Sequence, residues 1–76
     1  MDQELLNEQT QIERKTFSFS LKENPRGRFL KITEDVGGRR DTIIIPSTGL
    51  EKMREILDRA IVIDKKAGPF SVPPES

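Results

Sequence analysis

Strict alternation of apolar and polar side chains runs through residues 15–22, KTFSFSLK. Phe17, Phe19 and Leu21 fall on one side of an extended chain, and three hydroxyl side chains fall on the other with Lys22. A period of two residues predicts a β-strand with one buried face and one solvated face. Because a single strand cannot cover its own apolar face, the rest of the chain has to supply partner strands and a covering layer.

A tight turn follows this strand. Residues 24–27, Asn-Pro-Arg-Gly, have Asn first, Pro second and Gly fourth, which is the chemistry of a type I turn. The return strand at 28–33, RFLKIT, continues the alternation, so its leucine and isoleucine share one face. Phe29 and Lys31 then lie on the opposite, solvated face. The sequence therefore predicts a β-hairpin that exposes an aromatic ring beside a lysine.

A third strand and a helix follow the hairpin. Gly37-Gly38 indicates a second turn before the strand at 40–45, RDTIII. Thr48 followed by Glu51 matches the capping box that starts a helix, and apolar residues recur at helical spacing from 50 to 61. We expect this helix to pack its apolar stripe on the sheet, for which it is the available cover.

The two ends of the chain are less regular. A fourth strand is expected near residues 7–13, and the Pro-, Gly- and Ser-rich end is expected to be a flexible tail whose Phe70 and Val72 could dock on a partner. The prediction for residues 1–64 is an α+β domain, with an antiparallel sheet of three to four strands followed by one C-terminal helix. Residues 65–76 form the predicted tail.

Small size and a polar composition predict that the chain completes its core by pairing. A domain of this length buries only about 60% of the surface that its unfolded chain exposes, and 33% of the 76 residues are apolar, with no cysteine to add a disulfide. We therefore expect the chain to oligomerise. No apolar run approaches the roughly 20 residues of a membrane span, and the acidic start is unlike a signal peptide. These features predict a cytoplasmic or nuclear protein without a membrane partner.

Composition excludes most catalytic and metal-binding chemistries. The chain has no histidine and no cysteine, and hence no Ser-His or Cys-His nucleophile and no imidazole or thiolate zinc site. Glu34, Asp35 and Asp41 surround the second turn without the ligand order of a calcium loop. Gly37-Gly38-Arg39-Arg40 could cradle a phosphate through backbone amides. We predict a protein that is not an enzyme and that needs no metal or cofactor.

Charge is unevenly distributed although the net charge is zero. Residues 1–13 carry four acidic side chains and no basic one, whereas residues 14–40 carry eight basic and three acidic side chains. This basic block contains the predicted hairpin. A basic block favours a polyanionic partner such as a nucleic acid, and it equally suits a solvated surface. The residues alone leave both interpretations open.

The motif in the hairpin resembles a known family. Residues 22–32, KENPRGRFLKI, match the spacing K-x-N-x-[KR]-G-R-F-[LY]-[KR]-[IV], and an isoleucine-rich strand and P-x-x-G-L at the helix start follow it. This combination, over about residues 14–61, resembles one PUR repeat of the Pur-alpha family of purine-rich single-stranded nucleic-acid-binding proteins. The resemblance implies a Whirly-like fold, in which two intertwined repeats make one globular unit. A single repeat then implies a homodimer or pairing with another PUR repeat.

The resemblance also implies a site and a function. Matching the family motif onto this chain, with Lys31 added from the same strand face, gives a candidate nucleic-acid-binding set: Lys22, Asn24, Arg26, Arg28, Phe29 and Lys31. Cations of this kind neutralise phosphates, an amide can bond a base edge, and an aromatic ring can stack on a base. The expected function is binding of single-stranded DNA or RNA with a purine-rich preference, in transcription or RNA regulation, with some ability to open short duplexes.

The alternative is a protein-interaction or dimerisation module that does not bind nucleic acid. In that case Phe29 packs in the interface between subunits, and the motif is only a stable hairpin.

Overall fold

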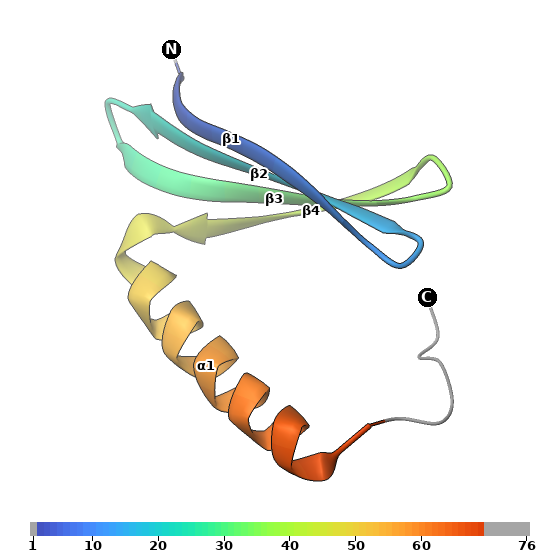
Figure 1. The fold of residues 1–76 in the computed structure, drawn as a ribbon. Helices are drawn as coiled ribbons and strands as arrows, with labels where there is room; N and C mark the ends of the chain where they lie inside the picture. The colour runs from blue at the N-terminus through green and yellow to red at the C-terminus, as the bar shows by residue number, and fades with distance from the viewer. Residues whose placement is uncertain (1, 70–76) are drawn as a thin grey trace.

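The computed structural model describes residues 2–69, which form an antiparallel sheet of four strands followed by one helix (Figure 1). This confirms the predicted α+β class, and the strand expected near residues 7–13 is present but begins earlier. A short 3-10 turn, η1, joins the sheet to the helix. The elements are β1 (Gln3–Ile12), β2 (Lys15–Asn24), β3 (Gly27–Val36), β4 (Arg39–Pro46), η1 (Ser47–Gly49) and α1 (Leu50–Ala67).

The strands follow one another as a meander, in the order β1-β2-β3-β4. Each pair is joined by a two-residue loop, because Ile12 pairs with Lys15, Asn24 with Gly27, and Val36 with Arg39. In the last loop Gly37 and Gly38 have φ values of 60° and 89°. Two consecutive positive φ angles are what a type I′ hairpin turn requires, and glycine adopts them without steric cost. The glycine pair therefore accounts for the tight connection between β3 and β4.

The pairing register separates the sheet into two faces, because directly paired residues share a face. One side, called here the apolar face, collects the large side chains of all four strands: Leu6, Phe17, Phe19, Leu21, Leu30, Ile32, Ile43 and Ile45. The other side, called the polar face, carries mostly hydroxyl, amide and charged groups. Its members include Asn7, Gln9, Ser18, Ser20, Lys22, Phe29, Lys31, Thr33, Thr42 and Ile44. The predicted alternation of residues 15–22 is confirmed.

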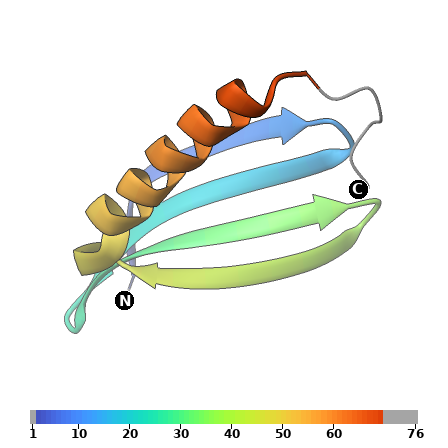
Figure 2. The same ribbon diagram turned by 90° about the horizontal axis from the view of Figure 1, so that it is seen from below.

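The helix does not cover the sheet, which corrects the expectation that its apolar stripe packs there. Figure 1 shows α1 leaving the end of β4 and diverging from the sheet, and Figure 2, seen from below, shows that α1 runs at an angle to the strands. Within the chain, its main tertiary contact is with η1. No side chain in residues 2–69 is buried. The radius of gyration is 15.0 Å, against about 11 Å for a compact domain of this length.

The helix itself differs from the prediction at both ends. Gly49 is the N-cap of the helix, and no side chain forms a capping hydrogen bond there. The predicted capping box between Thr48 and Glu51 was therefore wrong. The helix continues to Ala67, beyond the expected boundary at residue 64. Phe70, Val72 and most of the predicted tail lie outside the described residues.

The apolar residues of α1 other than Val62 fall on one side of the helix, within an arc of about 160° at 3.6 residues per turn. They are Leu50, Met53, Ile56, Leu57, Ala60, Ile61, Ile63 and Ala67. Five of them are large and strongly exposed, at 40–67% of their full accessible area. The helix therefore presents an apolar surface that is wider than the stripe of about 100° with which a helix typically faces one neighbouring layer.

Candidate nucleic-acid interface

The β2–β3 hairpin brings most of the sequence-predicted site residues to one surface. Lys22 pairs directly with Phe29, and Ser20 pairs with Lys31, so both lysines and the aromatic ring belong to the polar face. Asn24 is the last residue of β2 and belongs to the same face. Arg26 lies in the two-residue loop between the strands. The hairpin thus combines two cations and one aromatic side chain over two neighbouring strands.

Asn24 shapes the turn in this structure. Its Oδ1 accepts hydrogen bonds from the backbone N–H groups of Arg26, at 2.9 Å, and Gly27, at 3.2 Å. Its Nδ2 donates to Oδ1 of Asp2 at 3.3 Å. An Asn side chain that bonds its own turn in this way mimics a backbone turn and fixes the loop. A ligand can therefore compete for the amide donor of Asn24 more readily than for its carbonyl oxygen.

Arg28 lies on the opposite side of the hairpin from Phe29. It pairs with Glu23, and both Nε and Nη2 of its guanidinium lie 2.9 Å from Oε1 of that carboxylate. Both side chains are about half exposed, at 54% and 41%. Exposed ion pairs of this kind contribute only about 0–1 kcal/mol. Arg28 can therefore exchange its carboxylate partner for another anion, although it does not share the face of Lys22 and Lys31.

Phe29 is half-buried, which is less exposed than the sequence suggested. It pairs with Pro46 of β4, and the side chain of Ile44 lies on the same face. These residues line a shallow hollow of about 200 Å³ at the end of the sheet, together with Asn24, Arg26, Gly27 and Arg28. Four of the six predicted site residues therefore line one hollow. The ring packs against β4 on one side and still has accessible surface, as a stacking residue requires.

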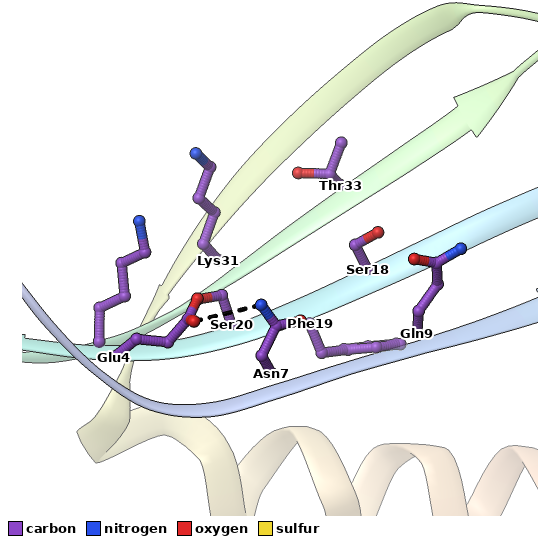
Figure 3. Close-up of a pocket in the computed structure, with 9 residues that line it drawn as sticks. Glu4, Asn7, Gln9, Ser18, Phe19, Ser20, Lys31 and Thr33 are labelled. Carbon is purple, nitrogen blue, oxygen red and sulfur yellow. Dashed lines mark hydrogen bonds between the residues drawn. The ribbon is translucent and has the colours of Figure 1, made fainter.

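A polar groove lies beside this hollow, over β1, β2 and β3 (Figure 3). Its volume is about 320 Å³, and the other two predicted residues, Lys22 and Lys31, line it. Sequence reasoning missed its other polar members, which are Glu4, Asn7, Gln9, Ser18, Ser20 and Thr33. In Figure 3 the side chains of Lys31, Thr33, Ser18 and Gln9 extend from the sheet on the side away from the helix. The period-two pattern of β2 already placed its serines on this face, but β1 gave no equally clear pattern.

Glu4 is an acidic side chain among these polar groups. Its Oε2 accepts a hydrogen bond from the Ser20 hydroxyl at 2.6 Å, and its Oε1 accepts one from the Asn7 amide at 3.2 Å. These two hydrogen bonds, with a smaller contribution from the charge of Lys22, hold the pKa of the Glu4 carboxyl below its usual value. Glu4 is therefore a fixed carboxylate anion at neutral pH.

The β3–β4 loop is stabilised by its own side chains. Asp35 accepts a hydrogen bond from Nε of Arg40 at 3.0 Å and another from the Gly38 backbone N–H at 2.9 Å. The Arg40 hydrogen bond and then the Gly38 N–H lower the pKa of Asp35. The Gly38 amide, one of the groups expected to cradle a phosphate, is thus already bonded to Asp35.

Two negative findings apply to residues 2–69. Over that range the structure groups no three acidic side chains closely enough to hold a metal ion. Its single helix is not apolar enough to cross a lipid bilayer.

Fold and surface together define a class of protein: a small antiparallel sheet module with a lysine-flanked polar face and an adjoining aromatic hollow, the kind of surface that suits a flexible polyanion with planar bases. Comparison with known proteins gives the family. The family model described as "PurA ssDNA and RNA-binding protein" matches residues 2–67, and the chain belongs to this family as a single PUR repeat.

A curated relative supports this assignment. The chain is 55% identical over 83 aligned residues to "Transcription factor Pur-alpha 1" of Arabidopsis thaliana, and the alignment covers 93% of this chain. It covers 28% of the relative, so the chain spans little more than a quarter of that protein's length.

Proposed function

We propose that this chain binds single-stranded DNA or RNA on the polar face of its sheet. The observation that carries the proposal is the convergence of Lys22, Phe29 and Lys31 on neighbouring positions of β2 and β3, in a chain whose family is described as binding single-stranded DNA and RNA. The lysines meet phosphates, the ring stacks on one base, and Arg26 and Arg28 approach the strand from the turn and the edge of the hairpin.

The proposed biological role is regulation of transcription or of RNA, in the nucleus or the cytoplasm. The relative's printed name, a transcription factor, supports this role. Opening of short duplexes belongs to the same proposal, because Phe29 lies at the end of the sheet where it can compete with a base pair for stacking. The groove and hollow on the polar face suit ligand binding, whereas the chain offers no histidine or cysteine for catalysis.

The proposed working unit is a homodimer, or a pair with another PUR repeat. The accessible surface of the chain is 6724 Å², which exceeds by about 2,000 Å² the value expected for a compact protein of 8.7 kDa. An obligate dimer commonly buries 2,000–5,000 Å² in total, roughly the excess of two such chains. The apolar face and the apolar arc of α1 are the surfaces that such pairing would cover. Dimerisation and nucleic-acid binding thus use opposite faces of the sheet.

A binding titration tests the proposed function. The full 76-residue chain is mixed with a fluorescent purine-rich single strand, a pyrimidine single strand and a duplex of the same length, at moderate salt. The expected result is retention of the purine-rich strand with weak binding of the duplex. Equal, weak binding of all three, or none, would refute single-strand recognition and favour the alternative of a pure dimerisation module.

A further inference from the structure

A β-bulge in β1 places Glu4 on the polar face. From Leu6 to Ile12 the strand pairs with β2 in one unbroken register, in which Leu6, Glu8 and Thr10 share the apolar face. The register shifts between Glu4 and Leu6, so Glu4 pairs with Lys22. Without the extra residue, alternation would put Glu4 on the same side as Leu6. Bulges commonly redirect a side chain beside a functional site, and this one turns a carboxylate into the polar groove.

The Glu4 carboxylate is oriented but not saturated. Each of its oxygens accepts one hydrogen bond, from Ser20 and from Asn7, whereas a carboxylate offers about four lone-pair positions in all. One acceptor position therefore remains on each oxygen. The result is a fixed pair of acceptors, side by side, in a groove of about 320 Å³ with Lys22 and Lys31 among its lining residues.

Among nucleobases this acceptor pair matches one edge. Guanine carries two adjacent donor groups, N1–H and the N2 amine, on its Watson–Crick edge, whereas adenine, cytosine and uracil each carry only one donor group there. A single strand presents this edge unpaired, and hydrogen bonds to it carry sequence specificity. A carboxylate repels phosphates, and although Lys22 partly offsets the charge of Glu4, a base edge with two donors is a better partner for this carboxylate than the nucleic-acid backbone.

We propose that Glu4 is a specificity-determining residue that accepts both donors of a guanine base seated in the polar groove. Ser20 and Asn7 hold the carboxylate in position, and the two lysines bind the phosphates on either side of that base. The inference rests on the proposed single-strand binding and adds to it the base that is read and the residue that reads it. Phe29 lies in the neighbouring hollow and stacks on a different nucleotide.

The test compares guanine with inosine, which lacks only the N2 amine. The first probe is a single strand with isolated guanines separated by adenines, in lithium buffer so that no quadruplex forms. The second probe is the same single strand with inosine at each guanine position. Wild type is expected to bind the guanine strand roughly tenfold more tightly, the lower range of one bidentate base contact. Glu4→Gln, which replaces one acceptor by a donor, is expected to remove that preference.

Glu8→Gln is the matched control. Glu8 is exposed on the same strand and has the same charge, but it pairs with Phe19 on the apolar face. It is expected to retain the wild-type preference. Ser20→Ala leaves the carboxylate itself intact and removes one of its two supports, so its preference is expected to be intermediate. Circular dichroism of each variant establishes that the sheet is retained.

The outcomes separate the inference from the function on which it depends. Loss of the guanine preference in Glu4→Gln with its retention in Glu8→Gln supports the role of Glu4. The role of Glu4 is refuted if wild type binds both strands equally, or if Glu4→Gln still prefers guanine. Neither result contradicts the proposed single-strand binding. A wild type that binds neither strand overturns the proposed function and the inference together.

Discussion

Replacing Leu57 by alanine tests whether the apolar arc of α1 is a dimer interface. Leu57 is 60% exposed in the single chain and lies within the apolar arc. Full burial of a leucine side chain contributes about 1.5–3 kcal/mol, so covering the exposed part contributes about 1–2 kcal/mol per subunit. A twofold interface counts this contribution twice. Leu57→Ala should therefore weaken the dimer by about 2–4 kcal/mol, or roughly 30-fold to several hundredfold in dissociation constant.

Sedimentation equilibrium over a dilution series measures this dissociation constant directly. Alanine and leucine both favour helices, so the helix is expected to persist and the change to report packing. Val62→Ala is the matched control, because Val62 is 51% exposed but projects from the charged side of the same helix. Its dimer should be nearly as stable as wild type.

Two results would refute the reasoning. A wild-type chain that stays a folded 8.7 kDa monomer at every concentration would show that the apolar face and the helix need no second copy. Equal dissociation constants for Leu57→Ala and Val62→Ala would show that the apolar arc is not the surface that pairs.

The remaining predictions concern the ligand face and pH. Phe29→Ala should weaken single-strand binding by about 1–3 kcal/mol and leave the salt dependence of binding unchanged, since no cation is lost. A fluorescence titration at several salt concentrations measures both quantities. If the variant unfolds, the Phe29 ring stabilises the fold and its role in binding is refuted. Lys22→Ala combined with Lys31→Ala should reduce the slope of log affinity against log salt by about 1.4, at about 0.7 per phosphate contact. Arg28→Ala should reduce that slope less, because Arg28 is already paired with Glu23; an equal reduction would place Arg28 on a phosphate. Glu4 and Asp35 have lowered pKa values in the folded chain, so their contributions to stability are complete above their ordinary values of 4.5 and 3.8 and are lost as the pH falls through the lower folded values. The melting temperature should fall at pH values below about 4.5, and Asp35→Asn should reduce that fall; a melting temperature independent of acid pH would contradict these assignments.

The features that the sequence predicted correctly depend on residues close together in the chain. The alternation of residues 15–22 and the Asn-Pro-Arg-Gly turn fix a hairpin from contacts only a few residues apart, and the two faces of β2 and β3 follow from it. The assignment of Phe29 to the polar face is confirmed for the same reason. Its degree of exposure was overestimated because Pro46 packs beside it from β4, and burial depends on neighbours that alternation does not specify.

What the sequence did not predict depends on a single-residue irregularity in β1 and on the direction in which α1 leaves the sheet. The bulge in β1 leaves no recognisable pattern, since Leu5 and Leu6 are consecutive apolar residues that fit neither strand period. The expectation that α1 covers its own sheet followed from counting one available lid. That count assumes a compact domain in which the helix folds back on its sheet, whereas in this structure α1 diverges from the sheet.

The two faces of the sheet are built from alternate residues of the same strands, and this has a consequence for binding. In β2 and β3, Leu21 and Leu30 project to the apolar face, while their neighbours Lys22 and Phe29 project to the polar face. A subunit that covers the apolar face therefore restricts the backbone that positions the lysine and the ring. In an isolated chain no side chain in residues 2–69 is buried, so packing restrains the hairpin side chains less, and fixing them on binding reduces affinity. Pairing through the apolar face would restrict these side chains before the nucleic acid binds. The proposed dimer therefore favours binding on the polar face, even though its interface lies on the other side of the sheet.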